Sequence, residues 1–405
     1  MQRRTHLVDR SDGLPAALAL VDEPLLGVDV ERADADNYFR RAALVQVGTA
    51  ADCILIDTVA LELLPVLHEF LADRTIILHA LENDLVPLQA AGVDPPRIED
   101  TAIAASLLGL PIGLDPLLQE LLGVSLSPDK ERFQRADWAM RPLPADMLAY
   151  AADDVFHLPR LWLELADRLT GAGRMHWYEQ ERGLVVQRAA EDRRDWQRVR
   201  GAGKLDPRQR AVLRTLWESR EELARADDIA PNRVLREEVL VNLAQDPARD
   251  PGGIIRRNQR RRRPSDEHAT ALFQAQQDGR DADPVPKPSR GRGWDQADRR
   301  AYDALRKRRA VVAKELGLDA GTLCPSKPLW DAVLAAPQDG VELCEAAGMR
   351  PWQVELLAEP LWEAFTKAYA NNGAAASGSG EVDEHDLDNA ADGDVDAEEA
   401  QVKRS

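Results

Sequence analysis

Asp29 and Glu31 end the short apolar run that begins at Leu25. A short apolar run bounded by charged residues predicts a buried strand, along which side chains alternate between the two faces. Asp29 and Glu31 therefore share a face, where their negative charges repel each other. A cation between them would remove that repulsion, and carboxylate oxygens suit magnesium or manganese. Because Asp-x-Glu also occurs on solvated strand ends, the interpretation depends on further ligands in the chain.

Asp84 is the first candidate for a further ligand. It lies in the segment His79–Leu85, which follows an expected strand over 75–78 and opens an expected helix. This position places Asp84 near the edge of the sheet, where it could face Asp29 and Glu31. The alternative is an ordinary acidic residue at the start of a helix, where the helix dipole favours negative charge.

Tyr150 and Asp154 form a second candidate group farther along the chain. On a helix they are four residues apart and share a face. Asp153 is a rival for the same role, because the spacing of three residues also lies on that face. The alternative is a helix with a half-buried tyrosine and solvated acids.

The order of the predicted elements indicates a mixed sheet flanked by helices. Residues 25–31, 43–48 and 53–57 are predicted to be strands joined by short turns, so they pair antiparallel. A fourth strand over 75–78 and a short extended piece at Ile98 follow. Helices are expected over 61–71, 82–91, 101–109, 114–122 and 145–169. Alternating helices and strands of this kind define an α/β domain.

No strand pattern appears after Leu205, and two helical blocks of similar length follow. They flank a linker over 282–293 that is rich in proline, glycine and serine, and their apolar spacing suggests a repeat. The first block contains the run 256–263, with six arginines in eight residues. Such a run can neutralise several phosphates, although it can also be a solvated loop.

The composition narrows the possible partners. The 405-residue chain has a formal net charge of −18, partly from the acidic stretch 373–405, which we expect to be disordered. Nucleic-acid contacts must therefore come from local basic patches. Cys53, Cys324 and Cys344 are far apart and odd in number, which favours neither disulfides nor a zinc cluster and fits a reducing compartment. No segment is apolar enough to predict a membrane span.

Together the acids and the tyrosine resemble the DEDD superfamily of 3′→5′ exonucleases, in the subgroup with a tyrosine. Asp129-Lys130, Asp137-Trp138, Arg141-Pro142-Leu143 and Tyr150-Ala151-Ala152 are similar to the ribonuclease D family in particular. Both helical blocks resemble HRDC domains, the second as a degenerate copy. The resemblance implies a ribonuclease-H-like exonuclease domain over 1–200, HRDC domains over 205–285 and 292–372, and a tail over 373–405.

The resemblance also implies two-metal hydrolysis with magnesium or manganese. Asp29, Glu31 and Asp154 would hold one ion, and Asp29 would bridge to a second ion held by Asp84 through water. Tyr150 would orient the attacking water. Two cations about 3.5–4 Å apart supply a nucleophile at neutral pH and stabilise charge on the leaving oxygen. Val30 and Arg32 depart from the residues common in relatives, but neither is a ligand position.

The expected function is that of a cytoplasmic 3′→5′ exoribonuclease without a membrane partner or a small-molecule cofactor beyond metal. Its substrate would be RNA with a free 3′ end, such as a transfer RNA precursor, and its products nucleoside 5′-monophosphates. Lys130 and Arg141 are expected to touch the substrate backbone, although each could equally be a surface cation. The first helical block would add phosphate contacts through Arg260, Arg261, Arg262 and Arg263.

Two alternatives remain open from the sequence. One is a DEDD exonuclease whose substrate is DNA. The other is an inactive exonuclease scaffold that only binds nucleic acid. The complete set of four acids and Tyr150 argues against the inactive scaffold, but nothing in the residues separates RNA from DNA.

Overall fold

The computed structural model describes residues 3–33, 36–61, 64–126, 130–133, 136–189, 191, 194–246, 265–287 and 293–370, without the side chains of 130 and 131. The arginines predicted to bind phosphate at 260–263 and the acidic stretch 373–405 lie outside these ranges. The predicted domain boundaries stay predictions, and each part is described below by its elements.

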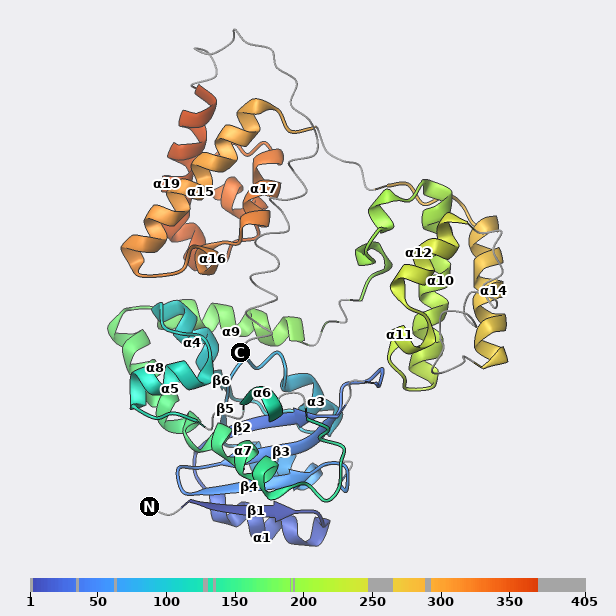
Figure 1. Ribbon diagram of the computed structural model, residues 1–405. Coiled ribbons are helices and arrows are strands. Elements are labelled where there is room, and N and C mark those ends of the chain that lie inside the picture. Colours follow the sequence, from blue (N-terminus) through green and yellow to red (C-terminus); the bar gives the residue numbers. More distant parts are fainter. Residues whose placement is uncertain are drawn as a thin grey trace.

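Six strands form one mixed sheet in the order β1-β4-β3-β2-β5-β6 (Figure 1). The strands are β1 (Arg4–Val8), β2 (Leu25–Arg32), β3 (Ala42–Gly48), β4 (Asp52–Asp57), β5 (Thr75–Leu78) and β6 (Ile98–Asp100). The antiparallel pairing of β2 with β3 and of β3 with β4 confirms the prediction. Strand β1 was not predicted, because this edge strand is mostly exposed and lacks an apolar pattern.

Helices cover both faces of the sheet. The first face packs against α1 (Leu14–Leu18), α2 (Pro65–Leu71) and α3 (Leu85–Ala90). The second packs against α4 (Thr101–Leu108), α5 (Leu114–Leu122), α7 (Ala145–Phe156) and α8 (Leu158–Gly171), with α6 (Lys130–Phe133) beside α7 and α9 (Met175–Ala189) beyond α4 and α8. This is the predicted α/β architecture of mixed sheet and flanking helices.

The predicted single helix over 145–169 is wrong. The chain breaks at His157 and starts α8 at Leu158. Pro159 has no backbone N–H to continue the hydrogen-bond ladder, and its ring clashes with the preceding turn, so one continuous helix is disfavoured here. The break ends α7 just after Asp154, which matters for the position of that carboxylate.

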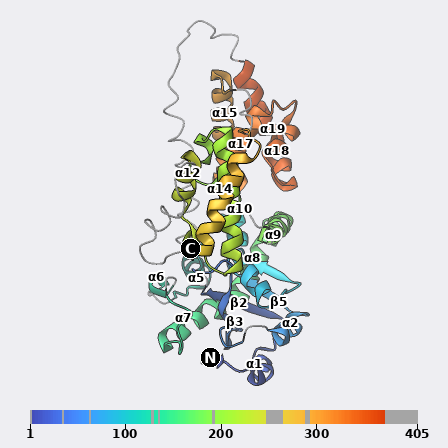
Figure 2. The same ribbon diagram turned by 90° about the vertical axis from the view of Figure 1, so that its right-hand side faces the viewer.

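The first helical block comprises α10 (Pro207–Ala226), α11 (Pro231–Val234), α12 (Glu237–Gln245) and α14 (Asp266–Asp281). Figure 2 shows α10 and α14 side by side. The block has its own apolar core, to which the sheet domain adds Tyr38. Asp228 accepts hydrogen bonds from the backbone N–H groups of Tyr38 (3.2 Å) and Phe39 (3.0 Å) and pairs with Arg41 (2.7 Å). The block is therefore attached to the loop that follows β2.

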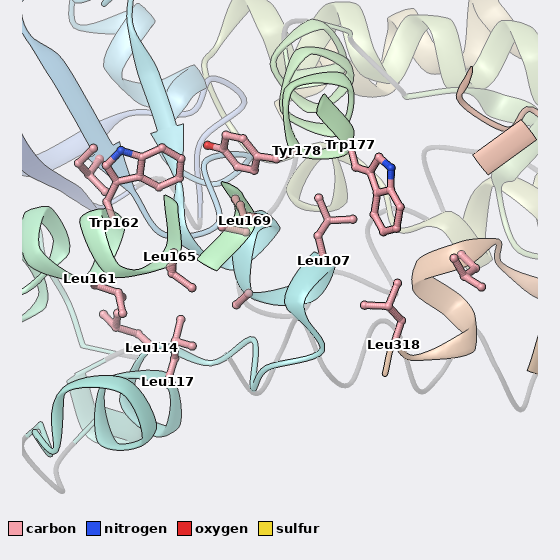
Figure 3. Packing of buried hydrophobic residues seen from close by; sticks show 14 of the residues in the cluster. Leu107, Leu114, Leu117, Leu161, Trp162, Leu165, Leu169, Trp177, Tyr178 and Leu318 are labelled. Carbon is pink, nitrogen blue, oxygen red and sulfur yellow. The ribbon is translucent and has the colours of Figure 1, made fainter. Parts of the chain in front are cut away.

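The second helical block comprises α15 (Gln296–Leu316), α16 (Ala320–Leu323), α17 (Ser326–Leu334), α18 (Gly340–Ala346) and α19 (Pro351–Ala370). Unlike the first block, it shares one continuous apolar cluster with the sheet domain (Figure 3). Leu107 of α4, Trp177 of α9 and Leu318 and Trp352 of the second block all belong to that cluster. Among the described helices, none is both long and apolar enough to cross a membrane.

Candidate active site

Alternation along β2 places the first two acids. Leu26, Val28 and Val30 pack into the apolar core of the first sheet face. Asp29 and Glu31 consequently project toward the second face, which α7 covers. The prediction from the sequence that both carboxylates share a face is confirmed.

Helix α7 brings the third acid to the same place. Carboxylate oxygens of Asp29, Glu31 and Asp154 all lie within 4.8 Å of one another. The rival Asp153 points elsewhere and pairs with Arg3 at 3.5 Å. The structure therefore joins Asp154, and not Asp153, to the two acids of β2.

Two glycines allow α7 to come this close, and the sequence analysis did not identify them. A Cβ at Gly27 would lie 2.3 Å from the carbonyl oxygen of Val155, and one at Gly48 would lie 2.6 Å from the Val155 Cγ2. Both distances are below any normal contact, so a side chain at 27 requires α7 to move outward, and one at 48 requires either that movement or a smaller residue at 155. Since Val155 follows Asp154 directly, these glycines set the distance between the α7 carboxylate and β2.

Asp84 lies on the turn between β5 and α3; it is not one of the three acids whose oxygens lie within 4.8 Å, but its charge acts on Glu31. It is 4% exposed and sits at the start of α3. The turn begins at Ala80, which has a φ of 64°, an unusual value for a residue with a side chain. The Asp100 carboxylate holds this turn by accepting the N–H of Leu81 at 2.6 Å. Asp100 was not singled out from the sequence, where it looked only like the residue before a helix.

The four acids repel one another, and burial amplifies the effect. Burial, and then the charges of Asp29, Asp154 and Asp84, raise the pKa of Glu31 well above its ordinary value. Burial, and then Asp29 and Asp100, likewise raise the pKa of Asp84, which Arg32 only partly offsets. These carboxylates therefore resist ionisation unless a positive charge joins them.

Tyr150 lies against the same acids. Its hydroxyl hydrogen-bonds to Asp154, and its ring packs on Phe133, with centroids 5.0 Å apart, and on Trp138. Burial, and then the negative charge of Asp154 and Glu31, raise the pKa of the hydroxyl. The phenol therefore stays protonated near neutral pH and serves as a hydrogen-bond donor, not as a base.

The donor set fits divalent cations. Clustered carboxylate oxygens are the ligands that magnesium and manganese prefer. Gln46, opposite Asp29 in β3, is fully buried, and among the described residues neither polar atom of its side chain has a hydrogen-bond partner. Such an amide fits beside a hydrated cation, because a water bound to the ion can donate a hydrogen bond to the amide oxygen.

Of the two cations predicted to touch substrate, the structure describes the side chain of only one. The side chain of Lys130 lies outside the described residues. Arg141 uses all five N–H donors within the protein: two to Asp57, at 2.5 and 2.7 Å, and three to backbone carbonyls. Burial would raise the pKa of Asp57, but the hydrogen bond from Arg141 and those from the backbone lower it overall. We interpret Arg141 as a residue that ties the 138–143 segment to the sheet.

Comparisons with known proteins identify the class of protein to which this chain is similar. Residues 5–170 match the family described as 3'-5' exonuclease, and residues 209–257 match the HRDC domain. The fold is that of the ribonuclease D from Escherichia coli, with a TM-score of 0.73 at 24% identity over 91% of this chain and 99% of that one. A protein of known structure from Bifidobacterium adolescentis gives 0.69 at 26% identity, over 89% and 97%. The chain thus combines a ribonuclease-H-like exonuclease domain with an HRDC-containing helical region.

Curated relatives give the family. The ribonuclease D of Xanthomonas oryzae is 34% identical over 261 residues, which cover 62% of this chain and 69% of the relative. That of Pseudomonas paraeruginosa is 36% identical over 230 residues, 55% of this chain and 60% of the relative. The chain belongs to the ribonuclease D family. Against the Pseudomonas relative, it spans less than two thirds of the relative's length.

Gly27→Ala tests the close approach of α7. The added methyl group must push α7 from β2, so we expect a loss of about 1–3 kcal/mol in the free energy of unfolding. We also expect weaker Mn²⁺ binding, because Asp154 moves away from Asp29. Thermal unfolding and calorimetric Mn²⁺ titration measure the two effects. Gly13→Ala is the matched control, since a Cβ there meets nothing within 4 Å; equal behaviour of the two variants would contradict the role of Gly27.

Stability should respond to pH and Mg²⁺ together. The pKa values of Glu31 and Asp84 are raised in the folded state, so the folded state binds more protons and stability falls as pH rises from about 4 toward neutral. Ligands must be deprotonated to bind metal. We therefore expect Mg²⁺ to raise Tm by a few degrees at pH 8, on the order of 2–4 °C per kcal/mol, and by less at pH 5.

The measurement is the difference in Tm with and without Mg²⁺ at each pH, which cancels the contribution of acids outside the site. Potassium chloride at equal ionic strength is the control for screening. A Mg²⁺ effect that is equal at both pH values would show that the ion does not bind these carboxylates.

Proposed function

We propose that this chain is a metal-dependent 3′→5′ exoribonuclease of the ribonuclease D type. The observation that carries the proposal is the convergence of Asp29, Glu31 and Asp154 within 4.8 Å, with Asp84 close enough to raise the pKa of Glu31. Clustered acids, of which Asp84 and Asp154 are buried and Asp29 and Glu31 half-buried, are unfavourable for the fold alone, which is typical of a functional site.

In this proposal each residue has a defined task. Asp29, Glu31 and Asp154 hold one divalent ion, Mg²⁺ or Mn²⁺, and Asp29 and Asp84 face a second. When bound, the two ions would supply a nucleophile from water at neutral pH and stabilise the charge on the leaving oxygen. The one proton of the Tyr150 hydroxyl goes to Asp154, so its oxygen would orient the attacking water by accepting a hydrogen bond from it.

The proposed substrate is RNA with a free 3′ end, and the proposed products are nucleoside 5′-monophosphates. Transfer RNA precursors as the substrate and a cytoplasmic location are proposed on the family resemblance alone. Support for an RNA substrate comes from the names of the curated relatives, which are ribonucleases. Lys130 and the run Arg260–Arg263 stay predicted substrate contacts.

Helix α15 offers a described surface for phosphate contact. One side of it carries the exposed Arg306, Lys307 and Lys314 and the half-buried Arg299 and Arg300, which at 100° per residue occupy about a third of the helix circumference. Asp303 is the acidic residue on the same arc. The Arg306 guanidinium also lies over the half-buried ring of Tyr302, 5.6 Å from its centroid, which helps to hold this cation in place. In a chain of net charge −18, this arc is a local basic patch.

Asp29→Asn tests the chemistry directly. The amide cannot replace the bridging carboxylate, so we expect hydrolysis of single-stranded RNA to fall more than about a hundredfold, beyond the 10- to 100-fold cost of losing an outer-shell partner. Release of 5′-monophosphates from a 3′-extended transfer RNA, single-stranded RNA and single-stranded DNA of equal length is the assay, with EDTA and with restored Mg²⁺.

The control for Asp29→Asn is Asp12→Asn, which makes the same chemical change at an exposed position. Cleavage by the Asp29→Asn variant at the unmodified rate would contradict the assignment of the active site. Equal cleavage of all three substrates, or of DNA alone, would overturn the preference for RNA.

A triple variant tests the basic surface of α15. Replacing Arg306, Lys307 and Lys314 by alanine should weaken RNA binding and flatten its salt dependence, by about 0.7 in slope for each lost phosphate contact. Cleavage of a short oligonucleotide should be unchanged, because the four acids are untouched. Binding to a 3′-extended transfer RNA in EDTA, over a salt series, gives the slope.

A second triple variant provides the control by removing Arg10, Arg168 and Arg236, which are exposed and paired with nearby acids. It changes the net charge equally but leaves α15 intact. Coincident slopes for the two variants would exclude a specific role of α15. Alanine at Arg260–Arg263 in parallel measures the share of the arginine run.

A further inference from the structure

Helix α9 lies between the sheet domain and the second helical block. Its neighbouring residues Trp177 and Tyr178 leave the helix in different directions, Tyr178 toward Trp162 and Trp177 toward Leu318 (Figure 3). Both side chains are buried, at 7% and 1% exposure. One helix therefore carries a contact to each part.

The side of α9 that faces the second helical block is held by a charge pair and an aromatic stack. Arg350 donates two hydrogen bonds to Glu181, at 2.6 and 2.7 Å, and the indole N–H of Trp352 donates to the same carboxylate at 2.8 Å. The rings of Trp177 and Trp352 stack with centroids 4.7 Å apart. Bidentate, partly buried pairs of this kind fix orientation as well as distance.

The side of α9 that faces the sheet is held by a second set of hydrogen bonds. The Tyr178 hydroxyl donates to Glu99 at 2.7 Å and accepts the backbone N–H of Asp100 at 2.8 Å. Arg182, one turn farther along, pairs with Glu99 at 2.5 Å. These bonds attach α9 to β6.

Strand β6 in turn holds the turn that carries Asp84. The fully buried Asp100 carboxylate accepts the N–H of Leu81 at 2.6 Å and the N–H of Ile103 at 2.8 Å. The carbonyl of Leu81 accepts the N–H of Asp84 at 3.2 Å. An unbroken series of contacts thus runs from the second helical block to the backbone of Asp84.

We infer that the second helical block serves as a positioning element of the active site, which fixes Asp84 through α9 and β6. Glu181, Arg350, Tyr178 and Asp100 are the positioning residues, and none of them touches substrate. The kinetic part of this inference rests on the proposed exonuclease function. The structural part, that the block orders the turn 81–84, does not.

The physical reason is the repulsion that acts on Asp84. Its carboxylate lies buried near other carboxylates, so the turn 81–84 needs contacts on the side away from these acids to keep its position. The support of Asp84 comes from long-range contacts and not from a long helix, since α3 has only six residues. A displacement of about 1 Å at a catalytic group can lower turnover about a hundredfold.

The test uses Glu181→Gln in the full chain. It removes the charge that holds Arg350, while all four acids and Tyr150 remain. We expect faster hydrogen–deuterium exchange in the peptide over 79–85, and the amide of Leu81 should report it. In calorimetry, the weaker of two Mn²⁺ binding events should lose affinity and the tighter one should not. In kinetics, kcat should fall on the order of tenfold and the Mg²⁺ requirement should rise, with KM for a short oligonucleotide unchanged.

Glu164→Gln is the matched control, because it breaks an exposed Glu–Arg pair in α8 and should change none of these values. The double variant Glu181→Gln with Arg350→Gln should change exchange, Mn²⁺ affinity and kcat no more than the more affected single variant does. Each single variant already breaks the same Glu181–Arg350 contact. Tyr178→Phe interrupts the same series at its middle and should give the same exchange pattern, which keeps the test decisive if Glu181→Gln folds poorly.

The outcomes separate this inference from the proposed function. Unchanged exchange over 79–85 in both Glu181→Gln and Tyr178→Phe would overturn the inference, whatever the activity. A raised KM with unchanged kcat and unchanged hydrogen–deuterium exchange would also overturn the inference, because the second helical block would then contribute only to substrate binding. If the unmodified chain cleaved no RNA, the proposed function would fail, while the exchange and Mn²⁺ measurements would still decide whether the block positions Asp84.

Discussion

Repulsion among clustered carboxylates, two of them buried and two half-buried, is the constraint on which this structure depends. Asp29, Glu31, Asp84 and Asp154 come from a strand, a turn and a helix, and no short stretch of backbone keeps them together. Each is held by contacts outside the group: β2 by its neighbours in the sheet, α7 by two glycines, and the turn before α3 by Asp100. The rest of the sheet domain can be understood as the rigid support that these charges require.

The sequence predicted the acids well because their positions follow from local periodicity. A strand period of two places Asp29 and Glu31 on one face, and a helical spacing of four pairs Tyr150 with Asp154. The mixed sheet followed from short turns between three apolar runs. Other roles act over long range: Gly27 looked like an ordinary strand residue, Asp100 like a helix start, and Arg141, predicted to be a substrate contact or a surface cation, binds Asp57 instead. Their partners lie 128, 19 and 84 positions away, which no local pattern reveals.

The two helical blocks differ in how they meet the sheet domain, and this difference was also invisible in the sequence. The first takes only Tyr38 of the 36–41 loop into its core and otherwise attaches to that loop through polar contacts of Asp228 and Arg233. The second merges its core with that of α4, α8 and α9. A polar junction around a separate core can open with little apolar surface exposed, whereas a shared core cannot. The first block is thus the better candidate for movement around a substrate, and the second for a fixed support.

The two glycines under α7 have different evolutionary freedom, although both face Val155. At Gly48 the nearest obstacle is Cγ2 of Val155, at 2.6 Å from the added Cβ, so an alanine at 48 is accommodated by a smaller residue at 155 and a small shift of its Cβ, which lies at 3.2 Å. The two positions can therefore change as a pair. At Gly27 the obstacle is a carbonyl oxygen, which every amino acid carries. No substitution at 155 removes it, so position 27 has no compensating partner there. Among related chains that keep this active site, we therefore expect positions 48 and 155 to covary while position 27 stays glycine.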